Sequence, residues 1–185
     1  LDDVLDAVRS QPIVPADIWA GLSKRYTLIG VEGIVRMAMS LVDVAAWDAL
    51  AKAEGLPLWR LLGADPHPVP AYNSNGLGLM SAAALADEAD RLLAGGFQAV
   101  KLRLGYASLD EDLASVHAVR NRIPDHIALM VDYNQALTVD EALRRSKALD
   151  GEGVYWIEEP VRHDDFKGCA VVAAAATTPV QIGEN

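Results

Sequence analysis

The sequence has very little cysteine and no long apolar run. Cys169 is the only cysteine among 185 residues, so no disulfide forms within the chain and a reducing compartment is expected. The longest apolar stretch, Cys169 to Ala176, is far shorter than the ~20 residues that a membrane-spanning helix needs. The acidic start Leu1–Asp3 lacks the basic region of a secretory signal. We therefore expect a cytoplasmic protein that does not interact with membranes.

Basic residues and phosphate-binding loops are also scarce. Sixteen Lys and Arg residues stand against 26 Asp and Glu residues, a net charge of −10, and no basic run or basic-aromatic stripe occurs. This excludes nucleic acid as an expected partner. Neither a Gly-rich dinucleotide fingerprint nor a Walker sequence is present. With 51% hydrophobic residues, the composition is typical of a globular protein that buries a sizeable core.

The chain divides into two parts of different character. The first part reads as helix, most clearly from Glu32 to Glu54, where apolar residues recur at helical spacing and Gly55 ends the segment. The segment Gly63–Pro68 is rich in turn residues, and short apolar strands begin after it. We therefore predict a helical domain at residues 1–66 and a second domain at residues 67–185.

The sequence of the second domain predicts repeated strand-helix units. The expected strands are Val69–Asn73, Ala99–Arg103, Ala128–Asp132, Val154–Glu158 and Val180–Glu184. The expected helices between them are Ala82–Ala94, Leu109–Arg122, Val139–Leu149 and Asp164–Ala176. Nearly continuous apolar strands separated by single helices indicate a parallel sheet covered by helices. Such a sheet is either doubly wound or closed into a barrel.

The position of the polar residues decides between these two α/β folds. Four of the five expected strands end in polar or charged residues, namely Lys101, Arg103, Asp132, Asn134, Glu158 and Glu184. Barrel enzymes carry their chemistry at the C-terminal ends of several strands, whereas a doubly wound sheet concentrates it at one crevice. The pattern therefore favours a TIM-like α/β barrel.

Three of these residues have the chemistry of a metal site. Asp132, Glu158 and Glu184 follow one another at equal intervals of 26 residues, which predicts equivalent levels on neighbouring strands. Each pair of carboxylates at about 4 Å repels by roughly 4 kcal/mol at an effective dielectric near 20, which favours a cation between them. Oxygen ligands without His or Cys predict Mg²⁺ first and Mn²⁺ second.

Several segments resemble the mandelate racemase branch of the enolase superfamily. They are Val100–Gly105, Val131–Gln135, Trp156–Pro160, Gly183–Asn185, and Asp43–Leu50 followed by Leu61–Gly63. The resemblance spans nearly the whole chain in the right order. It implies that residues 1–66 are the helical end of an α+β capping domain. Residues 67–185 would then hold the first five strands of a (β/α)7β barrel.

The resemblance also implies roles for individual residues. Asp132, Glu158 and Glu184 match metal ligands that hold the carboxylate of a small-molecule substrate while an enediolate forms. Ser74 matches a position that contacts this carboxylate, and Asn134 matches one near a substrate hydroxyl. For these two residues, ordinary hydrogen bonding in loops is an equally open interpretation. A homo-oligomer is the assembly that the resemblance implies.

The second strand departs from the family pattern. The family commonly has Lys-x-Lys, the second Lys being a base, whereas this chain has Lys101 and Arg103. Arginine is a poor base but a good fixed cation, so Lys101 is the candidate base, provided that burial and the neighbouring Arg103 cation lower its pKa. Because dehydration needs only one base and an acid, a sugar-acid dehydratase is favoured. A racemase or epimerase of a 2-hydroxy acid and a non-catalytic truncated fragment stay open, and the family's second base, a His, is expected beyond Asn185.

Overall fold

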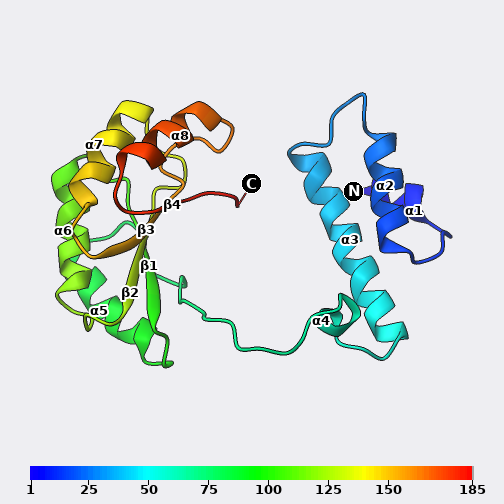
Figure 1. Ribbon diagram of the computed structural model, residues 1–185, viewed down its shortest axis with the longest axis horizontal. Helices are drawn as coiled ribbons and strands as arrows, with labels where there is room; N and C mark the ends of the chain where they lie inside the picture. The colour runs from blue at the N-terminus through cyan, green and yellow to red at the C-terminus, as the bar shows by residue number, and fades with distance from the viewer. Residues whose placement is uncertain (185) are drawn as a thin grey trace. The chain divides into compact units, whose positions relative to one another are not determined.

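The computed structural model describes residues 1–184 and divides the chain into two compact units, Leu1–Pro68 and a second unit from Val69 onwards (Figure 1). Asn185, the last residue of the Gly183–Asn185 motif, lies outside the described residues. Within residues 1–184, none of the helices combines the length and the apolar character needed to cross a membrane.

The first unit consists of helices. They are α1 (Asp2–Val8), α2 (Pro15–Arg25), α3 (Ile34–Ala53) and α4 (Leu58–Leu61). Helices α1, α2 and α3 share a core that includes Val4, Ile18, Leu22 and Met39, whereas α4 has no buried residue. The predicted helix between residues 32 and 54 is confirmed with its ends shortened by one or two residues. It stops because Gly55 adopts a φ of +65°, which favours glycine.

The second unit is a parallel sheet whose strands follow sequence order. Strands β1 (Ala99–Arg103), β2 (Ala128–Asp132), β3 (Val154–Glu158) and β4 (Val180–Gln181) pair in the order β1-β2-β3-β4. Helices α5 (Ala82–Leu93), α6 (Leu109–Arg120), α7 (Val139–Leu149) and α8 (Phe166–Ala175) lie on one side of this sheet (Figure 1). An unbroken order, with every helix on the same side, is the arrangement of a barrel segment rather than a doubly wound sheet.

The prediction of five strands is wrong for the first of them. Between residues 69 and 73, only an isolated bridge from Asn73 to Val100 forms. Pro68 and Pro70 have no backbone N–H, so this segment lacks donors for a regular ladder. The described part of the barrel domain therefore contains four strands and one bridge.

Alternation along the strands separates the core from the site. Val100 and Leu102 of β1, like Leu129 and Val131 of β2, are fully buried in the cluster that packs against the helices. The residues between them therefore point to the other face of the sheet. On β1 this second face carries Lys101.

Candidate metal and substrate site

Lys101 joins two acidic residues at the C-terminal ends of neighbouring strands. Asp132 on β2 is the register partner of Glu158 on β3. The Nζ atom of Lys101 lies 3.0 Å from Oδ2 of Asp132 and 2.8 Å from Oε1 of Glu158. Because both carboxylates approach one cationic nitrogen, the two side chains converge above the end of the sheet. The predicted common level of Asp132 and Glu158 is therefore confirmed.

The surroundings of Lys101 keep it charged in this arrangement. Burial opposes the charged form, but hydrogen bonds to Glu158 and Asp132, together with their charges, outweigh it and raise the pKa of Lys101. The Tyr72 ring adds a cation-π contact, with its centroid 5.8 Å from Nζ. Lys101 is thus a cation that balances two carboxylates, and in this state it is not a base.

Two aromatic residues that were not among the predicted site residues border this group. The indole Nε1 of Trp156 donates to Oε2 of Glu158 at 3.1 Å, which fixes the second oxygen of that carboxylate. Tyr72 packs edge-on against Trp156 with ring centroids 5.7 Å apart. The signal was available, because Trp156 lies two residues before Glu158 and therefore on the same face of β3.

Glu184 lies near the site but not at the predicted level. Glu158 pairs with Gln181, three residues before Glu184, so equal spacing in sequence did not give equal height. Strand β4 is short, and Gly183 adopts a φ of +117°, which turns the chain after it. Loss of hydration and the negative charges of Glu159 and Asp132 raise the pKa of the Glu184 carboxyl. The charge of Asp132 therefore acts on the Glu184 carboxyl, although Glu184 lies beyond the end of β4.

The structure brings Asn134 to Glu184. Strand β2 ends at Asp132, and the backbone N–H of Asn134 donates to Oδ1 of Asp132 at 2.8 Å. Asn134 has a φ of +50°, a left-handed conformation that Asn tolerates better than most residues. Its Nδ2 donates to Oε1 of Glu184 at 3.1 Å. Asn134 thus connects the turn after β2 with the segment after β4.

Ser74 and Arg103 border the site without joining the carboxylates. Ser74 is exposed, directly after the bridge at Asn73. Arg103 ends β1 as the register partner of Asp132, and its backbone N–H donates to the carbonyl of Leu77 at 2.8 Å. Its Nε is buried and has no acceptor within residues 1–184. Arg103 therefore offers an unused donor at the end of the sheet.

The donor set fits a divalent cation, although the side chains are not gathered around one. Within residues 1–184, no three His, Cys, Asp or Glu side chains stand close enough together to hold a metal ion. The ammonium of Lys101 instead lies between Asp132 and Glu158. Carboxylate oxygens are the ligands that Mg²⁺ and Mn²⁺ prefer, and Glu184 is close enough to be repelled by Asp132.

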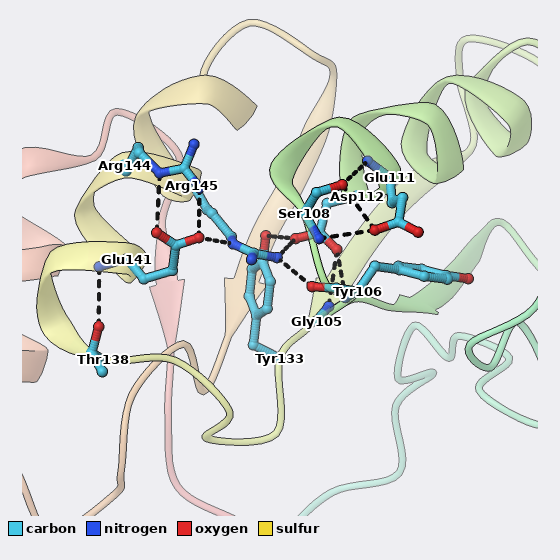
Figure 2. A network of polar contacts seen from close by, with 10 residues as sticks. All are labelled: Gly105, Tyr106, Ser108, Glu111, Asp112, Tyr133, Thr138, Glu141, Arg144 and Arg145. Atoms are coloured by element: carbon cyan, nitrogen blue, oxygen red, sulfur yellow. Dashed lines mark hydrogen bonds and ion pairs between the residues drawn. The ribbon is translucent and has the colours of Figure 1, made fainter.

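A second polar group, also missed from the sequence, lies behind the strand ends. The carboxylate of Asp112 is fully buried on α6 and receives the guanidinium of Arg145 and the hydroxyl of Tyr133 (Figure 2). Burial and the charge of Asp112 raise the pKa of the Tyr133 hydroxyl, so it remains a donor. Helical spacing placed Asp112 one turn into a helix but gave no sign of its long-range partners.

Family models match both parts of the chain. Residues 84–185 match the model described as enolase C-terminal domain-like. Residues 4–63 match the N-terminal domain of mandelate racemase / muconate lactonizing enzyme.

Individual relatives agree with these matches. The 3,6-anhydro-alpha-L-galactonate cycloisomerase of Streptomyces coelicolor is 39% identical over 91% of this chain and 46% of its own length. The L-talarate/galactarate dehydratase of Salmonella typhimurium is 36% identical over 90% of this chain and 41% of its own length. An enolase from alpha pretobacterium bal199, crystallised with bound magnesium, superposes with a TM-score of 0.94 at 43% identity, over 99% of this chain and 52% of that one. The chain spans less than half the length of these two curated relatives.

Proposed function

Because the chain belongs to the mandelate racemase / muconate lactonizing enzyme family of the enolase superfamily, we propose that it acts in a magnesium-dependent sugar-acid dehydratase. The substrate class is a small polyhydroxy carboxylate, and the product is a 2-keto-3-deoxy acid. The racemase or epimerase of a 2-hydroxy acid is the second candidate. Its support is the position of Lys101, which an isomerase of this family would also use.

One observation carries the proposal. Side chains from β1, β2 and β3 meet at the C-terminal end of a parallel sheet, where Lys101 lies within 3.0 Å of both Asp132 and Glu158. This is the end at which α/β-barrel enzymes assemble their active sites. The two carboxylates provide oxygen ligands for a divalent cation that would bind an anionic substrate, and Lys101 provides a group that exchanges protons.

Asp132, Glu158 and Glu184 are the proposed ligands of Mg²⁺, with Mn²⁺ as the alternative ion. When bound, the ion supplies positive charge that meets the second negative charge developing next to the substrate carboxylate. The presence of magnesium in the similar enolase crystal supports this assignment. The carboxylate-only donor set supports it independently.

The chain's own residues supply the rest of the proposed chemistry. In the proposed step Lys101 first gives up the proton that its ion pairs with Asp132 and Glu158 stabilise, and the neutral Nζ atom then accepts the α-proton. The C–H electron pair forms the C2–C3 double bond as hydroxide leaves C3, and the Lys101 ammonium returns a proton to the hydroxide to form water. The resulting enol then becomes the ketone. Arg103 acts as a fixed cation at the end of β1, the strand that also carries Lys101. Ser74 and Asn134 are the proposed contacts of the substrate carboxylate and hydroxyl.

The substitution of Arg for Lys at position 103 favours dehydration over racemisation. Direct racemisation needs a group that gives and takes a proton on each face of the enediolate. Arginine exchanges protons poorly because its pKa is far above 7. The name of the Salmonella dehydratase agrees with this choice of reaction class.

The proposal includes the setting of the enzyme. We place it in the cytoplasm, because its single cysteine, Cys169, is a buried free thiol, as in proteins of reducing compartments. We also propose a homo-oligomer, on the family resemblance. Light scattering coupled to size-exclusion chromatography tests the assembly, and a monomer at micromolar concentration contradicts it.

The decisive experiment uses the protein expressed at the full length of its gene. It is incubated with Mg²⁺ in D₂O and a panel of sugar acids and aryl 2-hydroxy acids, while NMR follows the keto product and α-deuteration together. A keto product that requires Mg²⁺ and disappears in Glu184→Gln supports the dehydratase. Glu152→Gln is the control, since Glu152 pairs with His117 and lies just before the N-terminal end of β3, opposite the end that carries Glu158. Deuteration with loss of optical purity and no keto product means a racemase or epimerase instead.

A further inference from the structure

The buried carboxylate of Asp112 is the centre of a network behind the candidate site. Its Oδ1 accepts the backbone N–H groups of Gly105 and Tyr106, each at 3.0 Å. Its Oδ2 accepts the hydroxyl of Tyr133 at 2.9 Å and Nη1 of Arg145 at 2.6 Å. Figure 2 shows these four donors pointing at one carboxylate from three segments of chain. Asp112 therefore ties the loop after β1, the turn after β2 and helix α7 together.

Local sequence explains why this carboxylate reaches the loop. Ser108 caps α6 through a reciprocal capping box with Glu111, so the helix begins immediately after the loop. Asp112 stands one turn into α6, where its side chain points back toward the N-terminus and the loop. Gly105 adopts a φ of +108°, a conformation that favours glycine and turns its N–H toward Asp112.

One branch of the network leads to the proposed metal ligand Asp132. Tyr133 is fully buried and lies between Asp132 and Asn134 in the chain. The backbone after it is strained, with a φ of +50° at Asn134 and +66° at Gln135. Such conformations persist only when surrounding contacts hold them. The hydrogen bond from Tyr133 to Asp112 is one such contact, on the residue directly next to the ligand.

The other branch leads to the loop that carries Ser74. The hydroxyl of Tyr106 donates to the carbonyl of Met80 at 2.6 Å and accepts the N–H of Met80 at 2.8 Å. This pair of hydrogen bonds fixes the end of the segment from residue 74 to residue 80. The backbone of Tyr106 is itself held by Asp112 and by Nη1 of Arg145, which donates to its carbonyl at 3.0 Å.

We propose that Asp112 is a positioning residue that serves both halves of the site, orienting the metal ligand Asp132 through Tyr133 and the substrate loop at Ser74 through Tyr106. This rests on the proposed function, in which Asp132 holds Mg²⁺ and Ser74 contacts the substrate. The two effects can be separated by mutation, because the hydroxyl of Tyr133 serves only the branch to Asp132 and that of Tyr106 serves only the branch to the loop at Ser74.

The test compares Tyr133→Phe and Tyr106→Phe in the full-length protein. Magnesium affinity is measured by calorimetry without substrate, thermal unfolding in EDTA reports stability, and kcat and KM are measured at saturating Mg²⁺. Residues behind metal ligands typically change affinity by about 10- to 100-fold, and we expect about tenfold weaker Mg²⁺ binding in Tyr133→Phe. In Tyr106→Phe we expect a higher KM with Mg²⁺ affinity within about twofold of wild type.

A matched control and a central variant complete the design. Tyr155→Phe changes a ring that is 61% exposed, and none of the three measurements should move. Asp112→Asn removes the charge from both branches and should change Mg²⁺ affinity and KM together. If Asp112→Asn does not fold, Tyr133→Phe and Tyr106→Phe still test whether the network positions Asp132 and the loop at Ser74.

The outcomes separate this inference from the proposed function. If the wild type binds Mg²⁺ and turns over a sugar acid, but Tyr133→Phe loses only thermal stability, the network is merely structural and the inference is wrong. Equal changes of Mg²⁺ affinity in Tyr133→Phe and Tyr155→Phe also overturn it. If the wild type itself binds no Mg²⁺, the proposed function fails and this inference fails with it.

Discussion

The ammonium of Lys101 reaches across the whole of β2 to Glu158 on β3, at 2.8 Å, and contacts Asp132 of β2 on the way at 3.0 Å. The side chain of Lys101 is 15% exposed, and those of Asp132 and Glu158 are 8% and 6% exposed. This interaction joins three strand ends through one charge. Removing the Lys101 ammonium would leave two largely buried carboxylates, Asp132 and Glu158, without their shared positive charge.

Lys101→Met should destabilise the protein in EDTA by roughly 3–5 kcal/mol, the usual effect of breaking a buried ion pair by removing one partner. Mg²⁺ should recover more stability in this variant than in the wild type, because the ion supplies the missing positive charge. Chemical denaturation with and without Mg²⁺ measures both quantities. Lys52→Met is the control, since Lys52 forms an exposed pair with Asp48 and should change stability by less than about 1 kcal/mol. An equal Mg²⁺ effect in Lys101→Met and wild type would contradict the proposed metal position.

Arg103 should matter for its charge rather than as a base. Arg103→Met should lower kcat/KM for the sugar acid by about 100-fold, in the range reported for removing one preorganised donor. Arg103→Lys should retain substantially more activity because it keeps a cation at the end of β1. Steady-state kinetics with the keto product as readout measures this difference. Arg122→Met, which removes an exposed cation paired with Asp90, serves as control. Equal losses in both Arg103 variants would show that a charge alone is insufficient there.

The stability of the protein should depend on pH through Glu141. Arg144 and Arg145 lower the pKa of the Glu141 carboxyl from its ordinary 4.5 to about 2. A lowered folded-state pKa gives stability that is present above the ordinary value and is lost as the pH falls toward the folded one. The stability difference between wild type and Glu141→Gln should therefore narrow as the pH falls from 6 to 3.

Denaturation curves at several pH values between 6 and 3 measure this difference. Asp140→Asn, an exposed change on the same helix, controls for general acid effects. The buried Asp112 also contacts Arg145, so it is left intact in both variants. A difference between wild type and Glu141→Gln that stays constant across this range would contradict the prediction.

Two serines of the second unit should respond oppositely to alanine. Ser108 caps α6, accepting the N–H of Glu111 and donating to its carboxylate. Ser108→Ala should therefore destabilise by about 1 kcal/mol. Ser146 is 1% exposed and its hydroxyl has no partner within residues 1–184. Ser146→Ala should be neutral or slightly stabilising, because it removes an unpaired buried polar group. Thermal and chemical unfolding of both variants tests the contrast.

Local pattern by itself determined most of the helices and strands, although not the strand predicted at residues 69–73, and the face of the sheet on which the acidic residues stand. Helical spacing predicted α7 at Val139–Leu149, and the structure has those bounds. Alternation of apolar and polar residues placed Lys101 opposite the core and predicted the shared level of Asp132 and Glu158. These features follow from periods of 3.6 and 2 residues, which a few neighbouring side chains specify.

Tertiary structure alone decided how far the strands pair and what the side chains reach. Equal spacing did not bring Glu184 level with Glu158, because the pairing of β3 with β4 and the turn at Gly183 are set by contacts between distant segments. The meeting of Asp112 with Arg145, 33 positions along the chain, likewise depends on how α6 and α7 pack on the sheet. Periodicity fixes the direction in which a side chain leaves the backbone, whereas its partner depends on which segments the folded chain brings within a few ångströms.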